Sequence, residues 1–168
     1  MKIKFTNYKD GLHHFDFNTK VEELNLEEKF IGNVLLSCDM DKSSTQIVLN
    51  CDLTFSVNQV CDRCTTEFEE EFNTQFKNIY FITHSSDREL EDESGIYYLS
   101  PDEDKIDLSN DIVENALLTI PMKVLCKEDC KGLCSICGAN KNETECNCVT
   151  DTVNPVWEPL LKLKEKLN

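Results

Sequence analysis

The chain has 168 residues, an apolar fraction of 40% and a formal net charge of −15, which suits one domain with a modest core. Its 32 acidic against 17 basic residues argue against a non-specific nucleic-acid binder, because such proteins hold phosphates with Lys and Arg. The N-terminus lacks the apolar stretch of an export signal, and the sequence lacks a run of membrane-spanning length, so we expect a soluble, cytoplasmic protein.

The first part of the chain has the composition of strands. A short strand is expected at HHFDFN (13–18), and two longer runs, at 30–40 and 45–57, flank the polar turn DKSS. In the run at 45–57, apolar residues alternate with mostly polar ones, which is the period of a half-buried strand. Cys38 and Cys51 lie inside these runs without a nearby cysteine partner, and we interpret both as small buried hydrophobes.

The segment 66–82 is ambiguous, because its phenylalanines are spaced for one face of a helix and also for one face of a strand. Its Thr, Phe, Tyr and Ile content favours a strand that leaves the VCDRC turn. The next segment, HSSDRELEDESG (84–95), is dense in charge and is interpreted as a loop. IYYL (96–99) could form another short strand.

A helix is predicted after residue 106. Asp107 or Ser109 can cap it, Asp111 and Glu114 suit its first turns, and Pro121 ends it. Its buried stripe is expected to consist of Ile112, Val113, Ala116, Leu117 and Ile120.

A last helix is expected from Pro155, with an apolar side made by Trp157, Leu160, Leu161 and Leu167. The sequence therefore predicts an α+β fold: a mainly antiparallel N-terminal β-sheet with a central helix, a zinc-ribbon-like Cys-rich region and a C-terminal helix. In chain order, we expect a β-rich part with a CxxC hairpin (1–83), an acidic loop (84–105) and the helix with the Cys-rich region and terminal helix (106–168), all in one compact domain.

Cysteine clustering is the strongest signal in the sequence. Two ligands separated by two residues can converge on one ion through a tight turn, and Zn²⁺ prefers four thiolates in a tetrahedron. The most economical partition places the distal four in one local site and joins the two upstream cysteines to the remaining pair, although other pairings are possible. The first set is Cys61, Cys64, Cys126 and Cys130, and the second is Cys134, Cys137, Cys146 and Cys148.

Three other interpretations of these cysteines stay open: an iron–sulfur cluster, a thiol redox motif, and free thiols without metal. We favour one or two zinc ions in a structural role, because an all-thiolate site leaves no open position for activating water. The sequence offers little for catalysis, since its histidines are His13, His14 and His84 and it has neither a phosphate loop nor a nucleophile elbow. We therefore expect no enzyme.

The chain resembles the YceD family, large ribosomal RNA subunit accumulation proteins, in a set of motifs that follow the family's order. They are VCDRC (60–64) with Phe68, IDLS (106–109), LLTIP (117–121), CKEDCKGLCSICGANKN (126–142) and CNC (146–148). The resemblance implies a ribosome biogenesis factor without enzymatic activity that 23S ribosomal RNA needs in order to accumulate.

The partner implied by this resemblance is the large-subunit precursor. A basic ribosomal protein fits the acidic charge of the chain, and this is the mechanism that we favour. Direct binding of pre-ribosomal RNA is the other route, through candidate contacts at Lys123, Lys127, Lys131 and Lys141. We expect neither a membrane nor a small-molecule substrate. The alternatives are a zinc-stabilised protein-interaction module unrelated to ribosomes and a thiol-based redox or metal sensor.

Overall fold

The computed structural model describes residues 1–83 and 95–148. The chain divides into two compact units: the sheet unit, residues 1–59 and 67–124, and the cysteine unit, residues 60–66 and 125–168. The turn that carries the first two cysteines thus groups with the Cys-rich segment. That the whole chain behaves as one domain stays a prediction, and the expected helix from Pro155 lies outside the described residues.

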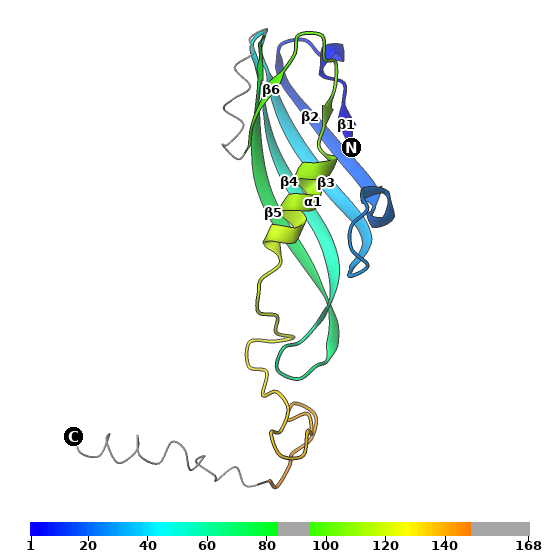
Figure 1. Ribbon diagram of the computed structural model, residues 1–168, viewed down its shortest axis with the longest axis vertical. Coiled ribbons are helices and arrows are strands. Elements are labelled where there is room, and N and C mark those ends of the chain that lie inside the picture. The colour runs from blue at the N-terminus through cyan, green and yellow to red at the C-terminus, as the bar shows by residue number, and fades with distance from the viewer. Residues whose placement is uncertain (84–94, 149–168) are drawn as a thin grey trace, which may run out of the picture. The chain divides into compact units, whose positions relative to one another are not determined.

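The sheet unit is built on a five-stranded sheet with the order β2-β3-β4-β5-β6 (Figure 1). The strands are β2 (Gly11–Lys20), β3 (Phe30–Lys42), β4 (Gln46–Val60), β5 (Glu67–Ile82) and β6 (Ile96–Leu99). β3 is antiparallel to β2 and to β4, whereas β6 runs parallel to β5. The expected mainly antiparallel sheet is confirmed, as is the strand that follows the VCDRC turn.

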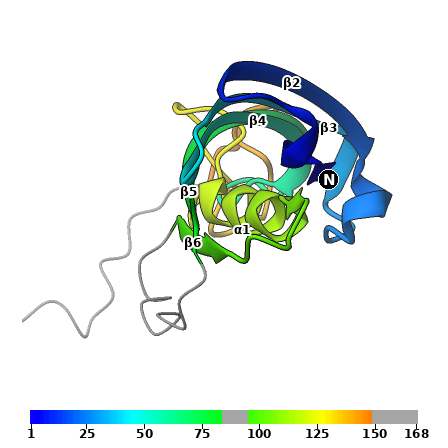
Figure 2. The ribbon, with the colours of Figure 1, turned by 90° about the horizontal axis from the view of Figure 1, so that it is seen from above.

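Shorter elements complete this unit. β1 (Lys2–Ile3) pairs antiparallel with β7 (Ile106–Asp107). Two 3₁₀ turns, η1 (Phe5–Asn7) and η2 (Val21–Leu24), precede and follow β2, and the helix α1 spans Ser109–Thr119. Figure 2 shows the sheet curving around α1, which covers its concave face. Within residues 1–83 and 95–148, every helix is too short or too polar to cross a membrane.

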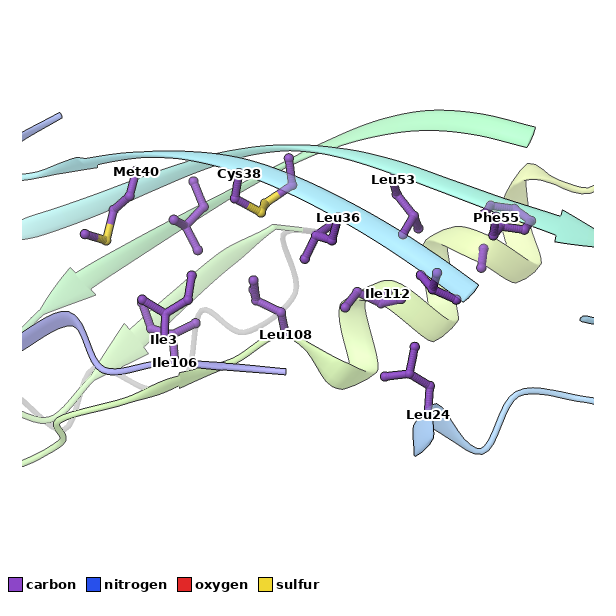
Figure 3. Close-up of a cluster of buried hydrophobic side chains, with 14 of the residues drawn as sticks. Ile3, Leu24, Leu36, Cys38, Met40, Leu53, Phe55, Ile106, Leu108 and Ile112 are labelled. Carbon is purple, nitrogen blue, oxygen red and sulfur yellow. A yellow bond between two sulfur atoms is a disulfide. The ribbon is translucent and has the colours of Figure 1, made fainter. Parts of the chain in front are cut away.

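Alternation along the strands creates the core. In β4 every second side chain from Ile47 to Gln59 is buried, and the apolar ones are Ile47, Leu49, Cys51, Leu53, Phe55 and Val57. These residues meet the buried side chains of β3, including Leu36 and Met40, and the helix residue Ile112 (Figure 3). The intervening side chains of β3 and β4 are exposed or half-buried on the opposite face, as the period of two requires.

The helix α1 begins and ends where the sequence predicts. The set of its residues that is buried, however, differs from the predicted one. Asp107 accepts the backbone N–H of Ser109 at 3.1 Å, and Ile112 and Ala116 are fully buried, as expected. Leu117, however, is 39% exposed, and Asp111 is buried at 8%. The prediction was wrong for Leu117, because the buried side of the helix is shifted toward Asp111, which bonds to residues of β5 and β6.

Asp111 is the acceptor of a buried hydrogen-bond cluster. The amide of Asn78 in β5 donates to its Oδ1 at 2.8 Å, and the hydroxyl of Tyr97 in β6 donates to the same oxygen at 2.5 Å. Burial, together with this bond to Asp111, raises the pKa of Tyr97 well above its usual range, so the hydroxyl keeps its proton. The cluster fixes the first turn of α1 to the sheet edge.

Cys38 and Cys51 face each other across β3 and β4, with their Cα atoms 4.2 Å apart, and a disulfide joins them (Figure 3). The sequence interpretation of two separate buried hydrophobes was therefore wrong, although both residues are buried. The reason is register: pairing of the two strands around the 43–46 turn brings these side chains directly opposite each other on the core face.

Candidate metal centre

The first of two cysteine turns closes the hairpin between β4 and β5 and carries Cys61 and Cys64. The N–H of Thr65 donates to the carbonyl oxygen of Cys61 at 2.9 Å, and the N–H of Cys61 donates to the carbonyl of Thr66 at 3.0 Å. The two bonds fold the chain tightly, so that both sulfur atoms lie within 4.8 Å of each other. Thr65 has a φ of 56°, which is a left-handed backbone that costs an L-residue about 1–2 kcal/mol.

The second turn repeats this geometry at Cys134 and Cys137. The N–H of Gly138 donates to the carbonyl oxygen of Cys134 at 2.9 Å, and the N–H of Cys134 donates to the carbonyl of Ala139 at 2.8 Å. Gly138 has a φ of 72°, which glycine adopts without the penalty that Thr65 bears. Two hairpin-like turns with equivalent bonds therefore present two pairs of sulfur atoms.

The first candidate centre gathers the sulfur atoms of Cys61, Cys64, Cys126 and Cys130, all within 4.8 Å of one another. The Sγ atoms of Cys61 and Cys130 are 3.8 Å apart, and those of Cys64 and Cys126 are 3.6 Å apart. Three of the four residues are buried, and Cys126 is half-buried. Residues 62 to 69 positions apart along the chain thus meet at one point.

Hydrogen bonds from both the backbone and a side chain hold the 126–133 segment against the first turn. The Arg63 guanidinium donates from Nη1 to the carbonyl oxygen of Cys130 at 2.9 Å. In return, the backbone N–H of Leu133 donates to the carbonyl oxygen of Arg63 at 2.9 Å. This close approach places Arg63 directly against Gly132. The first centre is therefore built by protein contacts as well as by its sulfur atoms.

The second candidate centre gathers the sulfur atoms of Cys134, Cys137, Cys146 and Cys148, again within 4.8 Å of one another. This set is local in the sequence and less shielded, since Cys137 is exposed and Cys146 and Cys148 are half-buried. The structure thus brings the eight cysteines together in the two sets that the sequence spacing favours. That they bind a metal stays a prediction.

The thiols of each centre differ in pKa. Burial raises the pKa of Cys61, but backbone N–H groups of Cys126 and of its own turn outweigh that effect and lower the pKa to about 6. Backbone N–H groups of Cys137 and Ile136 likewise lower the pKa of Cys134 to about 6. The first cysteine of each turn is thus a thiolate near neutral pH.

Another cysteine of each set resists ionisation. Burial and the neighbouring thiols raise the pKa of Cys126 to about 12. A hydrogen bond with Cys137, burial and the nearby sulfur of Cys134 raise that of Cys148 to about 12. Four sulfur atoms this close cannot all carry charge unless a cation neutralises them, and a divalent ion does so.

The donor sets fit such an ion. A tetrahedral thiolate site with metal–sulfur bonds of about 2.3 Å has sulfur–sulfur edges of about 3.8 Å. The first centre has edges of 3.6 and 3.8 Å, so it would accept the ion with little movement. Either set of four could hold a metal ion, and four thiolates are the ligands of zinc and of iron–sulfur sites.

The lysines proposed to contact RNA are divided between the units. Lys123 is exposed in the sheet unit, while Lys127 and Lys131 are exposed and Lys141 is half-buried in the cysteine unit. Exposed acids are interleaved with the last three, namely Glu128, Asp129, Glu143 and Glu145.

Sequence reasoning missed two polar residues that contact the sulfur atoms. The side-chain amide of Asn142 donates to the Sγ of Cys130 at 3.3 Å, and the Oγ1 of Thr66 lies 3.3 Å from the Sγ of Cys64. Such outer hydrogen bonds orient metal ligands and stabilise their charge. The signal available in the sequence was the CGANKN string, which places asparagines at fixed distances after Cys137.

Comparison with known proteins places these cysteines in a family. The family model described as large ribosomal RNA subunit accumulation protein YceD matches residues 49–164, a range that contains all eight cysteines of the two centres. The chain belongs to the YceD family. The description of this YceD model names the accumulation of an RNA and points to an accumulation factor rather than to a catalyst.

A chloroplast relative carries the same family name. The large ribosomal RNA subunit accumulation protein YCED homolog 1 of Arabidopsis thaliana is 33% identical to this YceD protein over 70 residues. The matched stretch is 42% of this chain and 22% of the relative, so the chain spans about a fifth of that protein's length. A search of the solved structures gave no match.

Proposed function

We propose that this YceD-family protein is a non-enzymatic ribosome biogenesis factor, required in the cytoplasm for 23S ribosomal RNA to accumulate on the way to the large subunit. The observation that carries the proposal is the family match over residues 49–164, which includes both cysteine sets. Depletion of the protein should lower the ratio of 23S to 16S ribosomal RNA and the yield of large subunits. An unchanged ratio would contradict the proposal.

In this proposal each centre holds one zinc ion in a structural role. The all-thiolate donor sets and their short sulfur–sulfur distances support zinc. Purified protein should contain two zinc equivalents by elemental analysis. Cys61→Ser should remove one equivalent and leave the second centre filled, since the second set is complete within residues 134–148. Loss of both ions in this variant would argue against two separate centres.

The charge of the sheet unit supports a basic protein partner. The convex face of the main sheet, here called the acidic face, carries outward carboxylates from four adjacent strands. They are Asp16 of β2, Asp39 and Asp41 of β3, Asp52 of β4, and Glu67, Glu69 and Glu71 of β5. On the same side, the hydrogen bond with Asp39 and the nearby charge of Asp16 raise the pKa of His14, as a negative surface should.

The acidic face also contains an exposed apolar side chain in a shallow hollow. A shallow hollow of about 350 Å³ lies between Asp16 and Asp52 and includes Leu35, which is 46% exposed. A Lys or Arg side chain can rest its aliphatic part on such a surface while its charged end reaches a carboxylate. We propose that the acidic face holds a basic large-subunit ribosomal protein and helps to place it on the RNA.

The test combines salt dependence with charge removal. Binding to basic large-subunit proteins should weaken steeply as salt rises through the physiological range. The triple variant Asp16→Asn, Asp39→Asn, Asp52→Asn removes three charges and keeps side-chain volume, and should weaken binding roughly tenfold. Its control is the variant that changes the exposed glutamates Glu22, Glu23 and Glu28 to Gln, with the same change in net charge. Equal effects of the two variants would count against the acidic face.

Direct RNA binding is the competing mechanism, and in-cell ultraviolet crosslinking separates it from the first. Enrichment of defined precursor 23S positions, lost when Lys127 and Lys131 are changed to Gln, would favour RNA contact through the cysteine unit. Co-purification with large-subunit particles without RNA crosslinks would favour the acidic face. Absence of both would contradict the ribosomal assignment itself.

A further inference from the structure

Asn142 connects the two cysteine sets. It lies in the loop between Cys137 and Cys146, which are both members of the second centre, yet its side-chain amide donates to the Sγ of Cys130 in the first centre at 3.3 Å. Asn142 is half-buried. A residue supplied by the loop of one centre is therefore a direct neighbour of a sulfur atom in the other.

Neighbouring groups fix the orientation of the Asn142 amide. The backbone N–H of Lys131 donates to its Oδ1 at 2.9 Å, so the NH₂ group must point away from Lys131 and toward the sulfur. That NH₂ group donates to Cys130 and, at 2.9 Å, to the Oδ1 of Asn140. Both of its hydrogens have acceptors, so exchanging the oxygen and the NH₂ group of the amide would lose these hydrogen bonds.

Asn140 makes a second connection to the first centre. Its Oδ1 accepts the backbone N–H of Asn142 at 3.0 Å, and its Nδ2 lies 3.4 Å from the Oγ1 of Thr66. The Thr66 oxygen in turn lies 3.3 Å from the Sγ of Cys64. Because a thiolate cannot donate, the Thr66 hydroxyl is the donor when Cys64 is ionised.

The turn that carries both asparagines depends on the second centre. Its ends are fixed by Cys137 on one side and Cys146 on the other, which must converge with Cys134 and Cys148. The backbone N–H of Thr144 donates to the carbonyl of Asn140 at 3.0 Å within this loop. The loop that places the Asn142 amide at Cys130 is thus bounded at both ends by cysteines of the second centre.

We propose that Asn142 is a positioning residue of the first centre and that it couples metal binding at the two centres positively. The inference rests on the proposed metal binding. A filled second centre holds the amide where it stabilises the Cys130 thiolate, so the first centre binds its metal more tightly. By thermodynamic linkage, filling the first centre tightens the second by the same factor.

Cadmium-substituted protein provides the test, because ¹¹³Cd NMR gives one signal for each filled centre. Cys61→Ser assigns the signals by removing that of the first centre. The variant is Asn142→Asp, which keeps an oxygen for the Lys131 N–H but replaces the donor to Cys130 by a carboxylate. Its control is Asn147→Asp, the same change at an exposed position between Cys146 and Cys148 of the second centre.

We expect Asn142→Asp to shift the first-centre signal and to lower cadmium affinity there roughly 10- to 100-fold in competition with a chelator. Asn147→Asp should leave the first centre unchanged. An Asn142→Asp protein whose first centre stays within twofold of the unsubstituted affinity would overturn the proposal. Protein that binds no cadmium at either centre would overturn the metal assignment as well, which separates the two failures.

Cysteine variants measure the coupling even if Asn142→Asp prevents the cysteine unit from folding. Cys61→Ser should lower the affinity of the second centre, and Cys134→Ser should lower that of the first, by the same factor. Affinities that stay independent within twofold would overturn the proposal.

Discussion

Gly132 lies so close to Arg63 that a Cβ atom on residue 132 would be 2.9 Å from the Arg63 carbonyl oxygen. That carbonyl accepts the N–H of Leu133, so it cannot move away without losing a hydrogen bond. Gly138 has nearly the same φ, 72° against 71°, but open space surrounds the position of its Cβ. A side chain at either position would bear the same backbone strain, but only a side chain at position 132 would also clash with a neighbour.

Alanine at these two positions should have unequal effects. Gly138→Ala should reduce the free energy of unfolding by about 1–2 kcal/mol, the cost of a left-handed L-residue. Gly132→Ala carries the same cost and adds the conflict with Arg63, for about 1–3 kcal/mol more. Urea unfolding of the metal-loaded proteins measures both values. Equal losses would show that the contact between residues 63 and 132 relaxes freely.

Acid should release metal from both centres. A metal ion must displace each proton that the free thiols hold, and each displaced proton changes affinity about tenfold per pH unit. Because the pKa values of Cys61 and Cys134 are lowered to about 6, one further proton per centre must be displaced below that pH. Metal affinity should therefore fall more steeply with decreasing pH below about 6 than above it. Chelator competition between pH 5 and pH 8 would measure the slope, and a slope that stays constant would contradict this picture.

The disulfide between Cys38 and Cys51 should appear in a thiol count. Of the ten cysteines, eight have free thiols. Alkylation in denaturant with a chelator should modify eight cysteines without reductant and ten after reduction, as read by mass spectrometry. Reduction should also destabilise the sheet unit by about 3 kcal/mol, the value for a loop of similar length. Ten modified cysteines without reductant would show that the bond is absent from the isolated protein.

Removal of the Asp111 carboxylate should destabilise the sheet unit. Asp111→Ala leaves the buried amide of Asn78 without this acceptor, which costs about 1–3 kcal/mol. Tyr97→Phe removes one donor and should cost about 1 kcal/mol. Glu114→Ala, at an exposed position of the same helix, should change stability by less than about 0.5 kcal/mol. Chemical denaturation compares the three, and equal values for Asp111→Ala and Glu114→Ala would contradict a structural role of the cluster.

The sequence predicts much of this fold because its strands alternate cleanly. The buried set of β4 and the end of α1 before Pro121 both follow from local periodicity and backbone restriction. The second cysteine set is local in the sequence, and each CxxC turn holds its own two sulfur atoms together wherever it lies. These features depend on short stretches that carry their own geometry.

Other features depend on neighbours that a single stretch does not contain. The burial of Asp111 requires Asn78 and Tyr97, on two other elements, and the contact of Asn142 with Cys130 requires the fold of the whole cysteine unit. The pairing of Cys38 with Cys51 was within reach, because both lie at equal distances from the turn at 43–46 and on the same strand face. We interpreted both as separate buried residues because neither has a cysteine partner nearby in the sequence.

The long sequence separation in the first centre gives its assembly a fixed order during translation. Cys61 and Cys64 leave the ribosome 62 to 69 residues ahead of their partners, which corresponds to roughly 3–14 s at typical rates of synthesis. All of β5, β6 and α1 are made in that interval. The first centre therefore closes only on a nascent chain whose sheet unit is already complete, whereas the second closes within a single short loop.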